Sequence, residues 1–194
     1  VADGVKEVVV QPTHIMNGYE YDDVVEEISA YEDQFDSLAL GAPLLTSYED
    51  YEAVVEALLA ESEYAGSADT ALVFMGHGTH HFANAAYSQL EAMMQAAGYV
   101  NAFVGTVEGF PTLDIVEGKL ATYGAQKVIL APLMVVAGDH ASNDMAGDEE
   151  DSWKTILTQA GYEVECVLEG MGQNVAIRAL YVEHVAAAIE NGSL

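Results

Sequence analysis

The chain has 194 residues, of which 51% are hydrophobic, and it carries 5 Lys or Arg against 32 Asp or Glu, for a formal net charge of -27. The apolar content argues against intrinsic disorder, and the negative charge argues against nucleic acid and anionic membrane surfaces as partners. A single cysteine, Cys166, excludes an internal disulfide, and no apolar run is long enough to span a bilayer.

Short apolar runs alternate with segments of helical spacing along the chain. In the first third, the pattern predicts strands over residues 5–11 and 38–41 and helices over residues 22–31 and 49–61, the second with Ser47 as its N-cap. After the small-residue linker 64–69, it predicts strands over 71–75, 100–105, 127–134 and 163–168, and helices over 84–97, 112–123, 150–160 and 174–190. This alternation is typical of an α/β fold with mostly parallel sheets.

Two segments of the chain resemble each other. Residues 4–20 overlay residues 124–140 without a gap, which aligns Gly4 with Gly124, Val8 with Val128, Pro12 with Pro132 and Gly18 with Gly138. The repeat predicts two related α/β domains, residues 1–66 and 67–194. The second has two strand–helix units before its matched segment and the first has none. We therefore expect the first domain to be incomplete, with a missing N-terminal segment of the same protein completing it.

A histidine between two glycines follows the most apolar predicted strand. Gly76 and Gly78 bracket His77, which lets the backbone turn sharply and lets a bulky partner approach. Glu108 and His140 follow the strands predicted at 100–105 and 127–134. Because the carboxyl ends of parallel strands share one edge of a sheet, we expect the three side chains to converge. Two imidazoles and a carboxylate form a ligand set suited to Co²⁺, Ni²⁺, Fe²⁺ or Zn²⁺.

Other interpretations of the histidines stay open. His77, His80 and His81 would share one face if the segment were helical and could then bind a metal together, although Gly78 disfavours a helix there. His184 lies on the last predicted helix and is expected to be structural.

The repeat also aligns Glu20 with His140, which predicts Glu20 at the corresponding edge of the first domain, and it leaves the role of His14 open. The sequence contains no G-x-S-x-G, H-E-x-x-H, Walker or G-x-G-x-x-G motif, so it does not indicate the hydrolase, zinc-protease or nucleotide sites that those motifs build.

Five stretches of the sequence together resemble the anaerobic cobalt chelatases, the sirohydrochlorin cobaltochelatases of the class II chelatase superfamily. They are residues 10–15 with Gly18, 73–79, 83–87, 105–109, and 131–141 with 143–145. The resemblance implies two flavodoxin-like domains with a tetrapyrrole cleft between them. It implies metal ligands at His77, Glu108 and His140, in agreement with the strand-end prediction. The family normally begins with a strand, a Ser-Phe-Gly-Thr-type loop and a long helix, which this sequence lacks.

The resemblance implies insertion of Co²⁺ into a sirohydrochlorin-type tetrapyrrole in anaerobic cobalamin biosynthesis. The divalent metal is then a substrate, with Ni²⁺, Fe²⁺ or Zn²⁺ as alternatives, and no organic cofactor is expected. The alternatives are an Fe²⁺ or Ni²⁺ chelatase of the same fold, or a non-catalytic metal- or haem-binding protein. We expect a cytoplasmic protein that forms a homo-oligomer, with no nucleic acid or membrane partner; an N-terminal targeting signal stays open because the first domain is expected to be incomplete.

Overall fold

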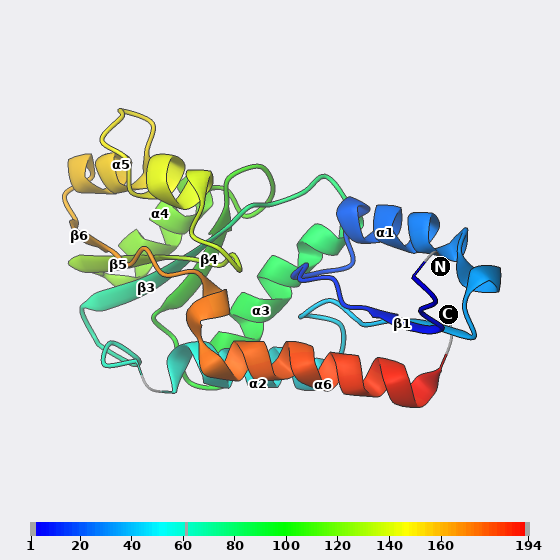
Figure 1. Ribbon diagram of the computed structural model, residues 1–194. Helices are drawn as coiled ribbons and strands as arrows, with labels where there is room; N and C mark the ends of the chain where they lie inside the picture. The colour runs from blue at the N-terminus through cyan, green and yellow to red at the C-terminus, as the bar shows by residue number, and fades with distance from the viewer. Residues whose placement is uncertain (1–2, 61, 193–194) are drawn as a thin grey trace.

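Two parallel sheets form the framework of the structure, a computed structural model that describes residues 3–60 and 62–192 (Figure 1). The first sheet pairs β1 (Glu7–Val10) with β2 (Ser37–Leu40). The second has the strand order β4-β3-β5-β6, with β3 (Thr70–Gly76), β4 (Ala102–Thr106), β5 (Lys127–Pro132) and β6 (Glu163–Cys166). Every strand pair is parallel, which confirms the predicted α/β class.

The helices follow the predicted order with small shifts at their ends. They are α1 (Tyr19–Ser29), α2 (Tyr48–Leu59), α3 (Ala85–Ala96), α4 (Leu113–Tyr123), α5 (Trp153–Gln159) and α6 (Val175–Asn191). Ser47 caps α2 as predicted and forms a capping box with Asp50. The helix predicted over 150–160 begins three residues late because Ser152 is its N-cap and accepts a hydrogen bond from the N–H of Thr155. In the described residues, no helix combines the length and apolarity that crossing a membrane requires.

Helices cover both faces of the second sheet. Along β3, which is buried throughout, Leu72 and Phe74 face one core, and Val73 and Met75 face the other. The first core is completed by α2, α3 and α6, and the second by α4 and α5. Burial on both faces explains why β3 reads as a continuous apolar run rather than as an alternating strand.

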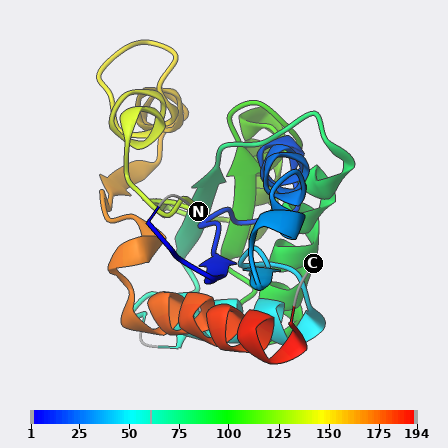
Figure 2. The same ribbon diagram turned by 45° about the vertical axis from the view of Figure 1, so that its right-hand side comes forward.

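The last helix returns to the first sheet. In Figures 1 and 2, α6 runs beside α2 and reaches under β1, opposite α1. Tyr181 of α6 donates its hydroxyl proton to the carbonyl of Thr13 at 3.1 Å, and Asn174 donates to the carbonyl of Ala57 at 2.7 Å. The division into residues 1–66 and 67–194 stays a prediction. Helix α6 belongs to the second of these units by sequence, and it packs against the first.

The repeat is visible in the backbone. The pair β1–β2 corresponds to β5–β6, and Gly4 and Gly124, which the overlay aligns, both have positive φ, at 76° and 84°. In the described residues the first sheet has two strands and the second has four.

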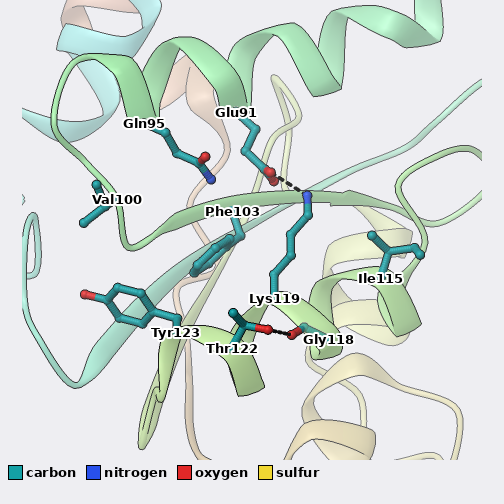
Figure 3. A pocket seen from close by; sticks show the side chains of 9 residues that line it. All are labelled: Glu91, Gln95, Val100, Phe103, Ile115, Gly118, Lys119, Thr122 and Tyr123. Atoms are coloured by element: carbon teal, nitrogen blue, oxygen red, sulfur yellow. Dashed lines mark hydrogen bonds and ion pairs between the residues drawn. The ribbon is translucent and has the colours of Figure 1, made fainter.

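Side chains of α3 and α4 cover the free edge of β4. The buried Glu91 accepts a hydrogen bond from the N–H of Val104 at 2.7 Å and pairs with Lys119 at 2.5 Å (Figure 3). A cavity of about 620 Å³ lies along this edge, and none of the predicted site residues lines it. An open strand edge can pair with another chain, and a carboxylate bonded to its N–H prevents that. We therefore assign these contacts to the fold.

Candidate metal centre

His77 directly follows β3, on a loop that two glycines shape. A Cβ on Gly76 would lie 2.2 Å from the ring of Tyr87, and a Cβ on Gly78 would lie 2.5 Å from the backbone nitrogen of Gly109. Gly78 also has a φ of 87°, a region that side chains disfavour. Both glycines are thus required for the reason predicted from sequence, with Tyr87 and Gly109 as the close neighbours.

Glu108 follows β4 and stays tied to the His77 loop. The N–H of Val107 donates to the carbonyl of Gly76 at 3.1 Å, and the N–H of Glu108 donates to the carbonyl of His77 at 2.8 Å. Beyond Glu108, the chain turns back, and the backbone and hydroxyl of Thr106 both donate to the carbonyl of Pro111. The parallel pairing of β3 with β4 thus continues past both strand ends and brings the two loops together.

His140 follows β5 after a longer loop, and the chain then forms a short π-helix over Ala141–Met145. The π-helical turn brings Asp144 back against the ring, where its carboxylate lies 2.5 Å from His140 Nδ1. Since a π-helical turn inside a protein often marks a functional site, this local geometry supports a special role for His140.

The three predicted residues come together. One ligand atom from each of His77, Glu108 and His140 lies within 4.8 Å of the others, and this is the one metal-compatible group of His, Cys, Asp or Glu in the described residues. The rings of His77 and His140 are 4.6 Å apart between centroids and nearly perpendicular, at 89°. His77 and Glu108 are exposed and His140 is half-buried, so the group is open to solvent on one side.

The hydrogen bonds at the two imidazoles fix their tautomers. His77 Nδ1 lies 2.8 Å from the carbonyl of Gly78, which can only accept, so Nδ1 carries the proton. His140 Nδ1 faces the Asp144 carboxylate in the same way. In the neutral form of each ring, Nε2 is then the nitrogen without a proton and the one that can bind a metal, while the acceptor at Nδ1 orients the ring as it does in many metal-binding histidines.

A cavity of about 310 Å³ lies between the two units beside this group. One wall comes from residues 13–16, Gly18 and Glu20 of the first unit, and the other from residues 77–79, Tyr87, Met134 and Val135. Glu20 therefore lies at the cleft, where the repeat predicted it. In the described part of the chain, Nδ1 of His14 is buried and has no hydrogen-bond partner. A cavity lined mainly by apolar side chains with a few polar groups among them is typical of ligand sites.

The remaining histidines do not join the group. His81 is buried, accepts a hydrogen bond from the N–H of Ala83, and faces Tyr19 and Asp22 of α1. His80 is exposed and lines a neighbouring cavity of about 570 Å³ with Glu108 and Phe110. The alternative in which His77, His80 and His81 bind a metal together is therefore wrong, because the segment is an extended loop rather than a helix.

His184 is not a member of the group of His77, Glu108 and His140. It bonds to Asp50 and to the carbonyl of Ala42, which confirms that it is structural.

Two further residues, Asp144 and Tyr87, support the centre, and no role was predicted for either from the sequence. Asp144 is found four residues after His140, a spacing that indicates a side-chain pair when the backbone is helical. Tyr87 accepts a hydrogen bond from the N–H of Gly78 at 3.2 Å, and burial raises the pKa of its hydroxyl. No local sequence signal links Tyr87 to the His77 loop, since this contact depends on the packing of α3 against β3.

Comparison with known proteins points to one family. The family model described as cobalt chelatase (CbiK) matches residues 1–190. The chain is 44% identical over 188 residues to the sirohydrochlorin cobaltochelatase of Salmonella typhimurium (strain LT2), covering 97% of this chain and 70% of that protein. It is 38% identical over 184 residues to the sirohydrochlorin cobaltochelatase CbiKC of Nitratidesulfovibrio vulgaris (strain Hildenborough), covering 94% of this chain and 65% of that protein.

Two solved structures share the fold. SirB from Bacillus subtilis with Fe³⁺ has a TM-score of 0.65 at 14% identity, over 96% of this chain and 73% of that chain. The sirohydrochlorin chelatase SirB from Bacillus subtilis subspecies spizizenii, in complex with cobalt, has a TM-score of 0.62 at 14% identity, over 98% of this chain and 72% of that chain.

Proposed function

The chain belongs to the cobalt chelatase (CbiK) family, and from this premise we propose that it inserts Co²⁺ into a sirohydrochlorin-type tetrapyrrole in anaerobic cobalamin biosynthesis. The observation that carries the proposal is the convergence of His77, Glu108 and His140, with ligand atoms within 4.8 Å of one another, at a cleft between two α/β units. The chain spans 70% and 65% of the two relatives' lengths.

We propose that the substrate ion binds to Nε2 of His77, Nε2 of His140 and the carboxylate of Glu108. With Nδ1 of each ring held by an acceptor, Nε2 is the nitrogen that a neutral imidazole offers to the ion. Three protein ligands leave other coordination positions of the ion for water or for a pyrrole nitrogen. The exposure of His77 and Glu108 supports direct access of the macrocycle to the ion.

Insertion exchanges two pyrrole protons for one divalent ion. As the pyrrole nitrogens replace the protein ligands, Co²⁺ leaves the two imidazoles and the carboxylate, and two protons leave the macrocycle. Imidazole accepts protons readily near neutral pH, so His77 and His140 can take them up once they have released the ion. Glu20, at the opposite wall of the cleft, is a further proton acceptor within the same cavity.

Apolar side chains on both walls of the cleft support contact with the ring plane of the macrocycle. Ile15 and Met16 on one wall and Met134 and Val135 on the other offer apolar contact to a planar ring. The carboxylates of sirohydrochlorin meet few cations, since the chain has 5 Lys or Arg in total. We expect backbone N–H groups of the cleft loops to take over that role.

The ligand set by itself does not select one divalent metal. Two imidazoles and a carboxylate bind Co²⁺, Ni²⁺, Fe²⁺ and Zn²⁺, and their affinities follow the general divalent order rather than a preference of this site. Iron or nickel insertion therefore stays the alternative of the same class, and a non-catalytic metal- or haem-binding protein stays the alternative of another class.

We also propose the setting of the reaction. The acidic composition disfavours nucleic acid and anionic membranes as partners, and we assign the protein to the cytoplasm. The two units of the proposed division are residues 1–66 and 67–194, with α6 returning to the first unit. Assembly into a homo-oligomer is retained as an expectation.

A metallation assay tests the proposal. Free-base sirohydrochlorin is incubated anaerobically with Co²⁺, Ni²⁺ or Fe²⁺, with and without protein, and the absorption spectrum of the macrocycle is followed. We expect Co²⁺ insertion above the rate without protein, its loss in His77→Ala and His140→Ala, and its retention in His80→Ala, the exposed histidine beside the centre. Binding of the macrocycle without any acceleration would favour the carrier, and faster insertion of Fe²⁺ or Ni²⁺ would favour the other chelatases.

A further inference from the structure

One side chain, Asn84, bonds to both loops that carry His77 and Glu108. Its Oδ1 accepts a hydrogen bond from the N–H of Thr79 at 3.1 Å, two residues after His77. Its Nδ2 donates to the carbonyl of Phe110 at 2.6 Å, two residues after Glu108. Because a backbone N–H only donates and a carbonyl only accepts, the two partners fix the orientation of the amide.

The side chain of Asn84 does not cap the helix that follows it. It directly precedes α3, where an asparagine commonly accepts a hydrogen bond from the first turn of the helix. Its backbone is helical instead of extended, at φ -54° and ψ -24°, and its side chain makes no cap hydrogen bond. Both polar atoms of the amide are directed away from α3 and toward the two loops.

The two loops are in backbone contact at the same place. A Cβ on Gly78 would lie 2.5 Å from the nitrogen of Gly109, and a Cβ on Gly109 would lie 2.3 Å from Asn84 Oδ1. The bond from the N–H of Glu108 to the carbonyl of His77 continues the pairing of β3 with β4. The partners of the Asn84 amide, Thr79 and Phe110, directly follow these two glycines. The amide therefore links the two loops beyond the last backbone hydrogen bond between them.

We propose that Asn84 is a positioning residue of the metal centre, which holds His77 and Glu108 at the separation that one divalent ion requires. The proposal rests on the proposed function, and Asn84 acts through the two loops without touching the ion. When the ligand loops are already ordered, less of the free energy of ion binding is lost to ordering them. Losing an outer partner of this kind typically weakens metal binding about 10- to 100-fold.

Co²⁺ titration of the full chain tests the proposal, followed by the visible absorption of the bound ion in the absence of tetrapyrrole. We expect Asn84→Ala to weaken Co²⁺ binding about 10- to 100-fold and to change the absorption band. Asn84→Asp keeps an acceptor for Thr79 but places a carboxylate oxygen against the carbonyl of Phe110, so its effect should be intermediate. Ser47→Ala, which removes the cap of α2, is the control for a general loss of stability and should bind Co²⁺ like the wild type.

Hydrogen exchange of the metal-free protein gives a second measurement that needs no metal. In Asn84→Ala, the amides of residues 77–80 and 108–111 should exchange faster than in the wild type, while those of β5 should not change. Faster exchange with wild-type Co²⁺ affinity would overturn the positioning role and leave only a structural one. Weaker affinity without faster exchange would overturn it as well, because the loss would not arise from loop order.

The wild type separates this proposal from the proposed function. If the wild-type chain shows no Co²⁺ band that depends on His77, the proposed metal centre fails, and the role of Asn84 fails with it. If the wild type binds Co²⁺ through His77 and Asn84→Ala binds it equally well, only the role of Asn84 fails.

Discussion

Asp144 contacts His140 at Nδ1, the ring nitrogen opposite the one that we propose binds the metal. The carboxylate lies 2.5 Å from Nδ1, with Asp144 four residues after His140 on the π-helical turn. This arrangement is the carboxylate–histidine pair that orients many metal-binding histidines, and it keeps the proton on Nδ1 and the lone pair on Nε2.

Removing this carboxylate should weaken metal binding without unfolding the protein. We expect Asp144→Ala to lower Co²⁺ affinity about 10- to 100-fold, and Asp144→Asn to lower it less because the amide oxygen still accepts a hydrogen bond. Asp139→Asn, an exposed change on the same loop, is the matched control. Calorimetric titration with Co²⁺ measures the difference, and equal affinities for Asp144→Ala and the wild type would contradict the assignment.

Gly78 and Gly118 form a pair of opposite predictions. Gly78→Ala places a Cβ 2.5 Å from the backbone nitrogen of Gly109 at a φ of 87°, so we expect a loss of at least about 1–3 kcal/mol in unfolding free energy, together with weaker Co²⁺ binding. Gly118 lies inside α4, and an added Cβ would meet no atom within 4 Å apart from its chain neighbours and the backbone of its own helix, so Gly118→Ala should stabilise the protein by about 0.5–1 kcal/mol. Urea unfolding of both variants measures the signs, and a stabilised Gly78→Ala would refute the loop geometry.

Asp50 makes the packing of α2 against α6 sensitive to acid. Burial would raise the pKa of its carboxyl, but the N–H of Ser47, the ring of His184 and the hydroxyl of Ser47 outweigh burial and lower it. The pKa is thus lower in the folded than in the unfolded state. The stabilisation is therefore fully present above the unfolded pKa of about 3.9, and it is lost as the pH falls through the folded pKa.

The variant Asp50→Asn should show this sign. At pH 7 we expect it to be less stable than the wild type by about 1 kcal/mol, because the amide oxygen still accepts a hydrogen bond but His184 and the Ser47 N–H lose a charged partner. Between pH 5 and pH 3 its stability should fall less than that of the wild type, since the titrating group is gone. Urea unfolding at a series of pH values measures both, and parallel pH profiles would contradict the role of Asp50.

The acidic surface should prevent retention on polyanions. With a net charge of -27, we expect no binding to heparin or to duplex DNA even at low ionic strength, as read by column retention. Retention that falls with added salt would reveal a local basic surface that overrides the net charge.

The proximity of residues that follow parallel strands could be predicted from the sequence alone. The apolar run before Gly76 and the strands before Glu108 and His140 are local patterns, and parallel pairing forces their carboxyl ends to one edge. The register seen in the structure agrees with this: Gly76 pairs with Thr106 and Met75 with Pro132, so His77 and the loops toward Glu108 and His140 begin at one level. The fold class, the repeat and the convergence of His77, Glu108 and His140 follow from such local rules.

The partners of these residues were decided by tertiary packing. His81 contacts Tyr19 and Asp22 of α1. The side chain of Asn84 bonds to two loops rather than to α3. Helix α6 packs back against the first unit. Each of these contacts joins segments whose spacing in sequence carries no periodic signal. Local propensity determines where a strand or helix forms, whereas side-chain contacts between distant segments depend on how the two units bury their shared apolar core, and only the folded structure specifies that packing.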